Sequence, residues 1–514
     1  MTSFNTFVIR LIIIGLFYIF SPPDNRGQSL ERDQMNRLSE AFGKKSIPAF
    51  IEFLQIPNNS YFPEQIHQNL IWLNRKFTEL GFKTSILKTS TNPYLLAEWK
   101  NTSSESSVLF YAHADGQPVD PSLWNQKDPY EPVLKEKSKT GSWNIIGWSS
   151  LEERIDPEYR IFARSSSDDK GPIMMLITAI EILQHENITL PYRLKVLIDL
   201  EEEKGSPGIQ YVAEKYREAL KSDFLVIFDG PKHYSHLPSL TFGARGISTI
   251  RLTVYGPRMS LHSGHYGNYA PNPALRLSRL LASMKDEQGR VIIPGYYDNI
   301  KMNRDTREQL TYVPDQTDQI NRSIGIHSAD KVGENYQESL QYPSLNIRGL
   351  SSGWTGNEVR TIIPDKAIAE IDIRTVPESD PKRLIDLVKQ HITNQGYYII
   401  NREPTDEERS DYSRIIAFES GTGYKAFRTD FNSPIGIWLY NAMMRVSCDE
   451  PVRKRISGGS VPVSPLVHIL EIPAVTVPTV NPDNNQHSPN ENLRLGNYLA
   501  GIKIFLAILT QPPE

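Results

Sequence analysis

The sequence contains a single cysteine, Cys448, among its 514 residues. It can therefore form no disulfide within the chain and no thiolate cluster, so any bound metal must use His, Asp and Glu side chains. A broad field of one charge is also absent, because 56 basic and 60 acidic residues leave a formal net charge of −4. We therefore expect neither nucleic-acid binding nor electrostatic attachment to a membrane surface.

Long apolar runs are absent after the N-terminus, and the one at the N-terminus is short. The segment Phe7–Phe20 is almost wholly apolar and is followed by two prolines, but a bilayer span needs about 20 residues. Gly27 and Ser29 fit a signal-peptidase site before Leu30. We expect residues 1–29 to be a signal peptide or an uncleaved membrane anchor, the alternative being a buried helix. The protein would then be exported, to the periplasm or the cell exterior.

The rest of the chain alternates between helical and extended patterns, which is typical of an α/β protein. Apolar residues recur at steps of three and four between residues 30 and 82, as in helices. Strands are predicted at residues 83–87, 94–99, 108–112, 192–198, 224–228 and 475–480, and helices at 173–183, 435–446 and 491–509. Residues 124–162 are rich in loop signals, and no regular structure is predicted for them.

A middle region has a different character and is predicted to be an inserted domain. It contains predicted strands at 248–255, 367–376 and 397–400 and predicted helices at 273–284 and 381–395, with a polar, poorly periodic portion at 288–344. We therefore predict a first catalytic part at residues 30–242, an inserted αβ domain at 243–429 and a second catalytic part at 430–514.

Histidine and acidic residues follow three of the predicted buried strands. His113 and Asp115 end the strand at 108–112 and share one face of an extended chain, so the carboxylate can orient a metal-binding imidazole. The alternative is a polar strand end with a hydrogen-bonded histidine. The acidic run 201–203 follows the second strand and Asp229 the third. Open α/β sheets place their sites at such carboxyl ends.

Two of these acidic clusters also have a structural interpretation. Asp168 and Asp169 precede a predicted helix with proline in its first turn, so they can cap that helix and also hold a metal. The run Glu201–Glu203 can be a solvated helix start. At the end of a buried strand, however, neighbouring carboxylates can divide metal binding and proton transfer between them.

Nearly all of the chain after residue 29 resembles the aminoacylase and carnosinase family of di-zinc metallopeptidases, peptidase family M-twenty, and within it the dipeptidase-like branch. The resemblance lies in the order of short motifs, which are HADGQPV from His113, SDDKGP with Asp168, EEKGSPG from Glu202, FDGP with Asp229, GARG from Gly243, LHSGHYG with His262, DIRTVP with Arg374, GGSVP from Gly458 and QHSPNE with His487. Each motif alone is weak, whereas their joint order is specific.

The resemblance implies a fold and a set of site residues. The fold would be an α/β zinc-peptidase catalytic domain, a mixed sheet flanked by helices, with an inserted α+β lid and dimerisation domain. One zinc ion would be held by His113, Asp168 and Asp229, and the second by Asp168, Glu203 and His487, with manganese or cobalt as possible substitutes. Asp115 would orient His113, and Glu202 would be the general base.

The resemblance also implies a reaction and further contacts. Glu202 would take a proton from a zinc-bridging water, and the resulting hydroxide would attack the amide carbonyl. His262 would reach into the site of a partner subunit, which makes a homodimer the expected assembly. Arg374 and Ser460 would bind the terminal carboxylate of a small peptide substrate, although Arg374 can instead be a surface residue of an alternating strand.

The sequence departs from the family in two places. The dipeptidase-like branch has histidine after Asp-Phe-Asn, whereas Ser433 follows here, and Ala163 to Ser165 stand where the family has Gly-Arg-Gly. We expect a dipeptidase or carboxypeptidase-like exopeptidase. A deacylase of N-acyl amino acids on the same metal site and a non-catalytic envelope binding protein remain the alternatives.

Overall fold

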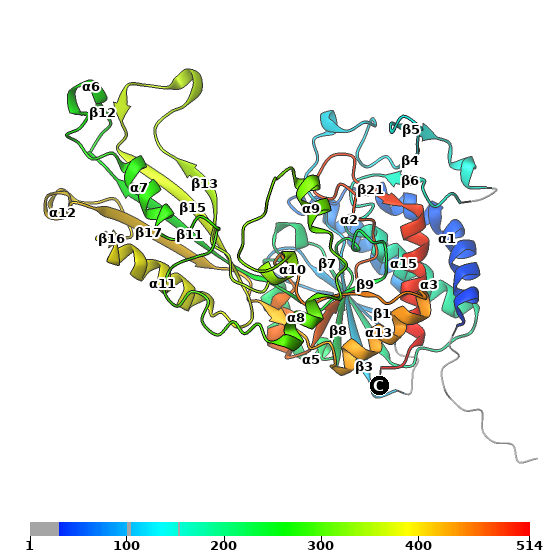
Figure 1. The fold of residues 1–514 in the computed structure, drawn as a ribbon. Coiled ribbons are helices and arrows are strands. Elements are labelled where there is room, and N and C mark those ends of the chain that lie inside the picture. The colour runs from blue at the N-terminus through cyan, green and yellow to red at the C-terminus, as the bar shows by residue number, and fades with distance from the viewer. Residues whose placement is uncertain (1–29, 100–103, 153–154, 514) are drawn as a thin grey trace, which may run out of the picture.

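The computed structural model describes residues 30–99, 104–152 and 155–513 of the chain (Figure 1). The N-terminal segment, which we expect to be a signal peptide or membrane anchor, lies outside the described residues, so that expectation stays a prediction. Among the described residues, none of the helices combines the length and the apolar character needed to cross a membrane.

A mixed eight-stranded sheet forms the centre of the larger body. Its order is β1-β2-β7-β3-β8-β20-β9-β19, and β7, β3, β8 and β20 run parallel to one another. The strands are β1 (Lys83–Leu87), β2 (Tyr94–Trp99), β3 (Ser107–His113), β7 (Arg193–Asp199), β8 (Phe224–Ile227), β9 (Ser239–Thr241), β19 (Val452–Lys454) and β20 (Ala474–Thr476).

Helices cover both faces of this sheet because its central strands are apolar on both sides. Phe110 of β3 belongs to one buried core and the adjacent Tyr111 to another. The first core takes residues from α1 (Arg32–Leu54), α2 (Pro63–Glu79), α3 (Lys170–His185), α13 (Pro434–Val446) and α15 (Leu495–Thr510). The second core takes residues from α4 (Ile209–Lys215), α5 (Arg217–Leu220) and α14 (Ser464–Leu470). The mixed α/β architecture expected from the sequence is confirmed.

A second sheet extends from this body as an arm (Figure 1). Its order is β13-β15-β11-β17-β16, and α7 (Pro273–Ala282) and α11 (Pro381–Asn394) pack on it around a separate core. The strands are β11 (Gly246–Tyr255), β13 (Asn346–Ser351), β15 (Lys366–Thr375), β16 (Tyr398–Ile400) and β17 (Ile415–Thr422). The core draws its members from residues 250–418, while the domain boundaries at 243 and 429 stay a prediction.

Short elements complete the arm and the junction between arm and body. The far end of the arm carries β12 (Leu261–His262), β14 (Ile362–Ile363) and α6 (Ser263–Tyr266) (Figure 1). The helix α12 (Asp406–Asp411) lies at the outer edge of the arm, beyond β16 (Figure 1). Residues 288–344, the polar and poorly periodic portion of the sequence, contain three short helices. These are α8 (Arg304–Leu310), α9 (Thr317–Ile324) and α10 (Tyr336–Ser339), which lie between arm and body (Figure 1). The short strands β10 (Gly243–Ala244) and β18 (Phe427–Arg428) pair with each other where the chain enters and leaves the arm.

A third small sheet corrects two sequence expectations. Its order is β21-β6-β4-β5, formed by β4 (Val133–Lys137), β5 (Trp143–Ile146), β6 (Arg160–Phe162) and β21 (Asn492–Arg494). Residues 124–162 therefore contain three strands where none was predicted, and residues 492–494 are a strand rather than the start of the last helix. These strands are short, and β21 pairs with a strand more than 300 residues earlier in the chain, so local periodicity could not reveal them.

Candidate metal centre

Three neighbouring parallel strands bring their carboxyl ends to one edge of the large sheet. His113 is the last residue of β3, the turn Glu202–Lys204 follows β7, and Asp229 follows β8. The order β7-β3-β8 places these three ends side by side. This edge is where open α/β sheets build their sites.

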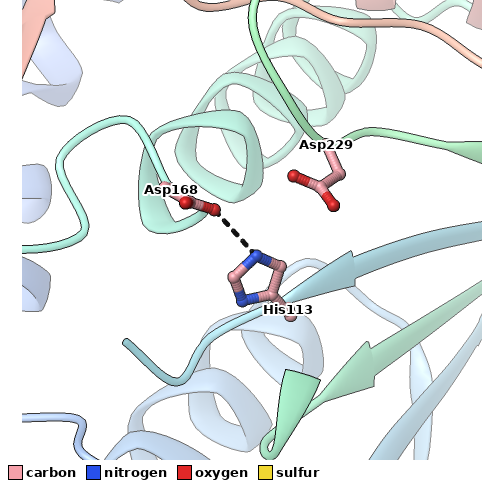
Figure 2. Close-up of side chains that lie close together, drawn as sticks. All are labelled: His113, Asp168 and Asp229. Carbon is pink, nitrogen blue, oxygen red and sulfur yellow. Dashed lines mark hydrogen bonds and ion pairs between the residues drawn. The ribbon is translucent and has the colours of Figure 1, made fainter. Parts of the chain in front are cut away.

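Three side chains form a first group that could hold a metal ion. Figure 2 shows His113, Asp168 and Asp229 pointing toward one another, with the imidazole facing Asp168. The His113 Nε2 and Asp168 Oδ1 atoms are 3.0 Å apart. One possible ligand atom of each residue lies within 4.8 Å of those of the other two.

A second group shares Asp168 with the first. Asp168, Glu203 and His487 also offer ligand atoms within 4.8 Å of one another. His487 Nε2 lies 3.1 Å from Asp168 Oδ2 and 3.2 Å from Glu203 Oε2. The structure thus brings together both expected sets of ligands around one shared carboxylate, and their role as metal ligands stays a prediction.

Asp115 connects the histidine strand to the acidic turn. Its side chain is fully buried, and its two carboxylate oxygens accept hydrogen bonds from the backbone N–H groups of Glu202 and Glu203 at 2.9 and 3.0 Å. His113 Nδ1 lies 3.5 Å from Asp115 Oδ1. Asp115 therefore positions the turn that carries both glutamates. It also lies beside the imidazole, and its role in orienting His113 stays a prediction.

The first glutamate of the acidic run faces away from this centre. Glu201 is fully buried and accepts hydrogen bonds from the Tyr94 hydroxyl, the Thr91 hydroxyl and the backbone N–H groups of Asn92 and Gly208. Its carboxylate anchors the turn to the segment before β2. Only the two following glutamates remain to take part in chemistry at the centre.

The electrostatics of the centre favour cations. Burial raises the pKa of Glu202 well above its usual value, and Asp229, Glu203 and Asp168 raise it further although His113 acts in the opposite direction. Burial, followed by the charge of Asp168, raises the pKa of Glu203 to about 8. These carboxylates repel one another across a buried space. Oxygen and imidazole ligands in this arrangement fit two divalent ions, because the ions would offset the repulsion.

The shared aspartate keeps its negative charge through two histidines. Burial acts to raise the pKa of Asp168, but hydrogen bonds with His113 and His487 hold it below the usual value. In the same way, the hydrogen bond to Asp168 raises the pKa of His487 to about 9 although its burial opposes this. Asp168 is therefore available as an anionic bridge between two ions.

Glu491 supports the loop that carries Asp168, and the sequence analysis did not single it out. Its buried carboxylate accepts hydrogen bonds from the backbone N–H groups of Ser165, Ser167 and Asp168, and it pairs with Arg164 at 2.7 Å. Glu491 was visible as the last letter of the QHSPNE motif. An acidic residue between two asparagines, Asn490 and Asn492, gives no further signal of its partners, which lie more than 300 residues earlier.

The glycine-free turn at Ala163 to Ser165 still adopts a conformation that favours glycine. Ser165 has a φ of 60°, in the left-handed region that L-residues rarely occupy. The side-chain amide of Asn58 donates to the Ser165 hydroxyl at 2.9 Å, and Glu491 accepts the Ser165 N–H at 2.9 Å. These two hydrogen bonds hold the backbone in a conformation that serine alone disfavours.

The remaining predicted site residues lie in two places. Arg374 of β15 donates from Nη1 to the Ser460 hydroxyl at 2.9 Å, and its Nε lies 3.4 Å from the Asp372 carboxylate. His262 is exposed on β12 at the far end of the arm, away from the large sheet (Figure 1). Within one chain the structure brings Arg374 and Ser460 together, whereas His262 joins neither of the two ligand groups.

This helix-covered α/β sheet carries at its carboxyl edge two groups of carboxylate and imidazole side chains that share one aspartate. Such an arrangement is typical of metal-dependent hydrolases. Comparison with known proteins gives the particular family. The model of peptidase family M20/M25/M40 matches residues 109–511. The chain belongs to this family and is a hydrolase that acts on peptide bonds.

Individual relatives match most of the chain. The Cys-Gly metallodipeptidase of Schizosaccharomyces pombe is 28% identical over 425 residues, covering 80% of this chain and 81% of the relative. The Beta-Ala-His dipeptidase of Homo sapiens is 25% identical, covering 82% and 77%. The crystal structure of an M20 family metallo-carboxypeptidase from Sulfolobus solfataricus is 27% identical and superimposes with a TM-score of 0.73, covering 91% of this chain and 99% of the other. The expected family and fold are thus confirmed.

Proposed function

We propose that this protein is a zinc-dependent exopeptidase that hydrolyses dipeptides and other short peptides. The observation that carries the proposal is the pair of ligand groups that share Asp168, with Glu202 beside them. The relatives named as Cys-Gly metallodipeptidase and Beta-Ala-His dipeptidase support a dipeptide substrate. When bound, two zinc ions would polarise the scissile carbonyl and lower the pKa of a water molecule that bridges them.

In the proposed reaction Glu202 carries the proton. It accepts the proton of the attacking water and then gives it to the leaving amine, as a general base followed by a general acid. The backbone N–H of Glu202 donates to Asp115, so the turn that carries its carboxylate is held in place. Burial raises the pKa of Glu202, and a higher pKa makes its carboxylate a stronger base toward the attacking water.

Arg374 and Ser460 are proposed to bind the free carboxylate of the substrate. The guanidinium already contacts the Ser460 hydroxyl, and its side chain is about one-third exposed. A guanidinium is well suited to a carboxylate because it can donate two parallel hydrogen bonds. This would confine the enzyme to substrates whose C-terminus is free.

The proposed function is tested with a panel of dipeptides, tripeptides, C-terminally amidated dipeptides and N-acetyl amino acids, assayed with and without a zinc chelator. We expect chelator-sensitive release of amino acids from the free dipeptides and about 100-fold lower kcat/KM for the amidated ones, since a charged partner of Arg374 would be lost. Cleavage of the N-acetyl amino acids alone would show a deacylase instead. Absence of any cleavage by zinc-loaded protein would contradict a hydrolase of small peptides.

We further propose that the protein is a homodimer in which His262 completes the site of the partner subunit. The position of His262 supports this, because it is exposed at the end of the arm, apart from the ligand groups of its own chain. Its Nδ1 accepts the Gly264 N–H at 3.0 Å, which leaves Nε2 free to face a neighbouring molecule. There the Nε2–H group would donate a hydrogen bond to the substrate carbonyl oxygen, on which negative charge develops during the reaction.

Mixed dimers test this assembly. A His262→Ala chain and a Glu202→Gln chain are co-expressed with different affinity tags, and dimers carrying both tags are isolated. Each variant alone should be nearly inactive, whereas the mixed dimer should recover about half of the wild-type rate because one of its two sites is complete. No recovery in the mixed dimer, or near wild-type turnover by His262→Ala alone, would rule out a shared site.

A further inference from the structure

A cavity of about 380 Å³ lies against the chain segments that follow Asp229 and precede Ser460, and it has no role in the proposed reaction. Its wall includes Pro231, two residues after Asp229, and Gly458, two residues before Ser460. The backbone N–H of Lys232 donates to the Val480 carbonyl at 3.0 Å. The cavity therefore opens between the loops that carry the candidate metal ligands and the loop that carries the proposed carboxylate anchor.

An ammonium group without a partner lies at this cavity. Lys454, the last residue of β19, lines the cavity, and among the described residues its Nζ has neither a hydrogen bond nor an ion pair. Burial lowers the pKa of Lys454, while the charge of Asp315 acts to raise it. Lys232 lines the same cavity, and burial together with Lys503 and Arg494 lowers its pKa to about 8. Lys232 is thus buried and Lys454 partly buried, and the residues that line the cavity include two lysines but one carboxylate, that of Asp315.

The acidic residue of the cavity is already engaged. Asp315 receives His233 Nε2 at 3.0 Å on one oxygen and the Gln337 side-chain amide at 2.6 Å on the other. Among the described residues Asp315 and Lys454 form no ion pair within 4.0 Å, although the charge of each acts on the pKa of the other. The rest of the wall is largely apolar and includes Ile320 and Ile456. A largely apolar cavity lined by two lysines and one carboxylate is suited to a short apolar chain that ends in a carboxylate.

We infer that this cavity holds the side chain of one substrate residue and selects aspartate or glutamate, whose carboxylate pairs with Lys454. The inference rests on the proposed function, since it names a substrate class for the same site. A glutamate side chain supplies the apolar methylenes and the terminal carboxylate that the cavity matches. A neutral glutamine would leave Lys454 without its counter-charge, and a lysine would be repelled.

The test measures kcat/KM for dipeptides that carry glutamate, glutamine or lysine at either position, with alanine at the other, together with Ala-Ala. Wild-type enzyme should prefer glutamate over glutamine by about 10-fold or more at one position, because a buried charge is otherwise unpaired. Lys454→Gln should abolish this preference, and Lys454→Glu should reverse it toward lysine. Lys382→Gln is the matched control and should keep the wild-type preference. Lys382 is an exposed lysine on α11 that pairs with Asp386.

The outcomes separate this inference from the proposed function. The quantity compared is the ratio of kcat/KM for the glutamate and glutamine dipeptides within each variant, so a changed ratio is a property of the cavity. Lys382→Gln should keep both this ratio and the Ala-Ala turnover of wild type. Equal rates for glutamate and glutamine in wild-type enzyme, or an unchanged preference in Lys454→Glu, would overturn the inference while Ala-Ala cleavage upholds the peptidase. Failure to cleave any of these dipeptides would overturn both.

Discussion

Replacing Glu202 by glutamine is expected to lower kcat by about 1,000-fold, because general acid–base catalysis typically contributes between 10² and 10⁴. Glutamine has nearly the same shape but cannot accept the proton of the attacking water. The turn itself is held by the backbone hydrogen bonds from Glu202 and Glu203 to Asp115, which the substitution leaves in place. Metal content and thermal midpoint should therefore stay close to wild type while steady-state turnover falls.

Glu201→Gln is the matched control in the same acidic run. Glu201 anchors the turn by accepting four hydrogen bonds, from Thr91, Asn92, Tyr94 and Gly208, so its replacement should lower the free energy of unfolding by about 2–3 kcal/mol. Denaturant titration and steady-state kinetics on both variants then distinguish a residue that stabilises the turn from one that takes part in the reaction. If Glu202→Gln retained turnover within tenfold of wild type, or if the two variants behaved alike, the assignment of Glu202 as the base would be wrong.

The sequence allowed the main sheet and the candidate centre to be predicted because their signals are local. Strands β1 and β2 were predicted at their observed bounds, since both are apolar runs closed by turn residues. The ends of β3, β7 and β8 carry the histidine and acidic residues directly. The resemblance to a family then supplied the more distant members of the centre, such as His487, which no periodicity could connect to Asp168.

Features that depend on distant pairing were missed. Strand β21 and the three strands of residues 133–162 pair only with one another in their sheet, and β5 is largely exposed, so neither length nor apolar alternation marked them. The partners of Glu491 likewise lie on another segment. The cavity beside Lys454 is closed by residues from 315 to 340. This polar portion forms two short helices, α9 and α10, and lacks the regular apolar pattern by which helices and strands are predicted.

Removing the divalent ions is expected to abolish hydrolysis and to lower the thermal midpoint. In the absence of ions the buried carboxylates of Glu202, Glu203 and Asp229 oppose one another, and their pKa values are raised. An ion present at about 1,000 times its Kd adds about 4 kcal/mol to the stability of the fold. Chelator-treated protein should therefore melt earlier, and zinc should restore both the midpoint and activity.

Asp168→Asn should remove both effects of zinc, the rise in thermal midpoint and the recovery of activity, because Asp168 belongs to both ligand groups. A neutral amide cannot bridge two cations as a carboxylate does, so the variant should bind less than one ion per chain by elemental analysis and show the same midpoint with and without zinc. His487→Ala is the comparison, since His487 belongs to one group only and its loss should leave about one ion bound. Two ions retained by Asp168→Asn would show that the shared carboxylate is not the bridge, and the proposed two-metal centre would have to be abandoned.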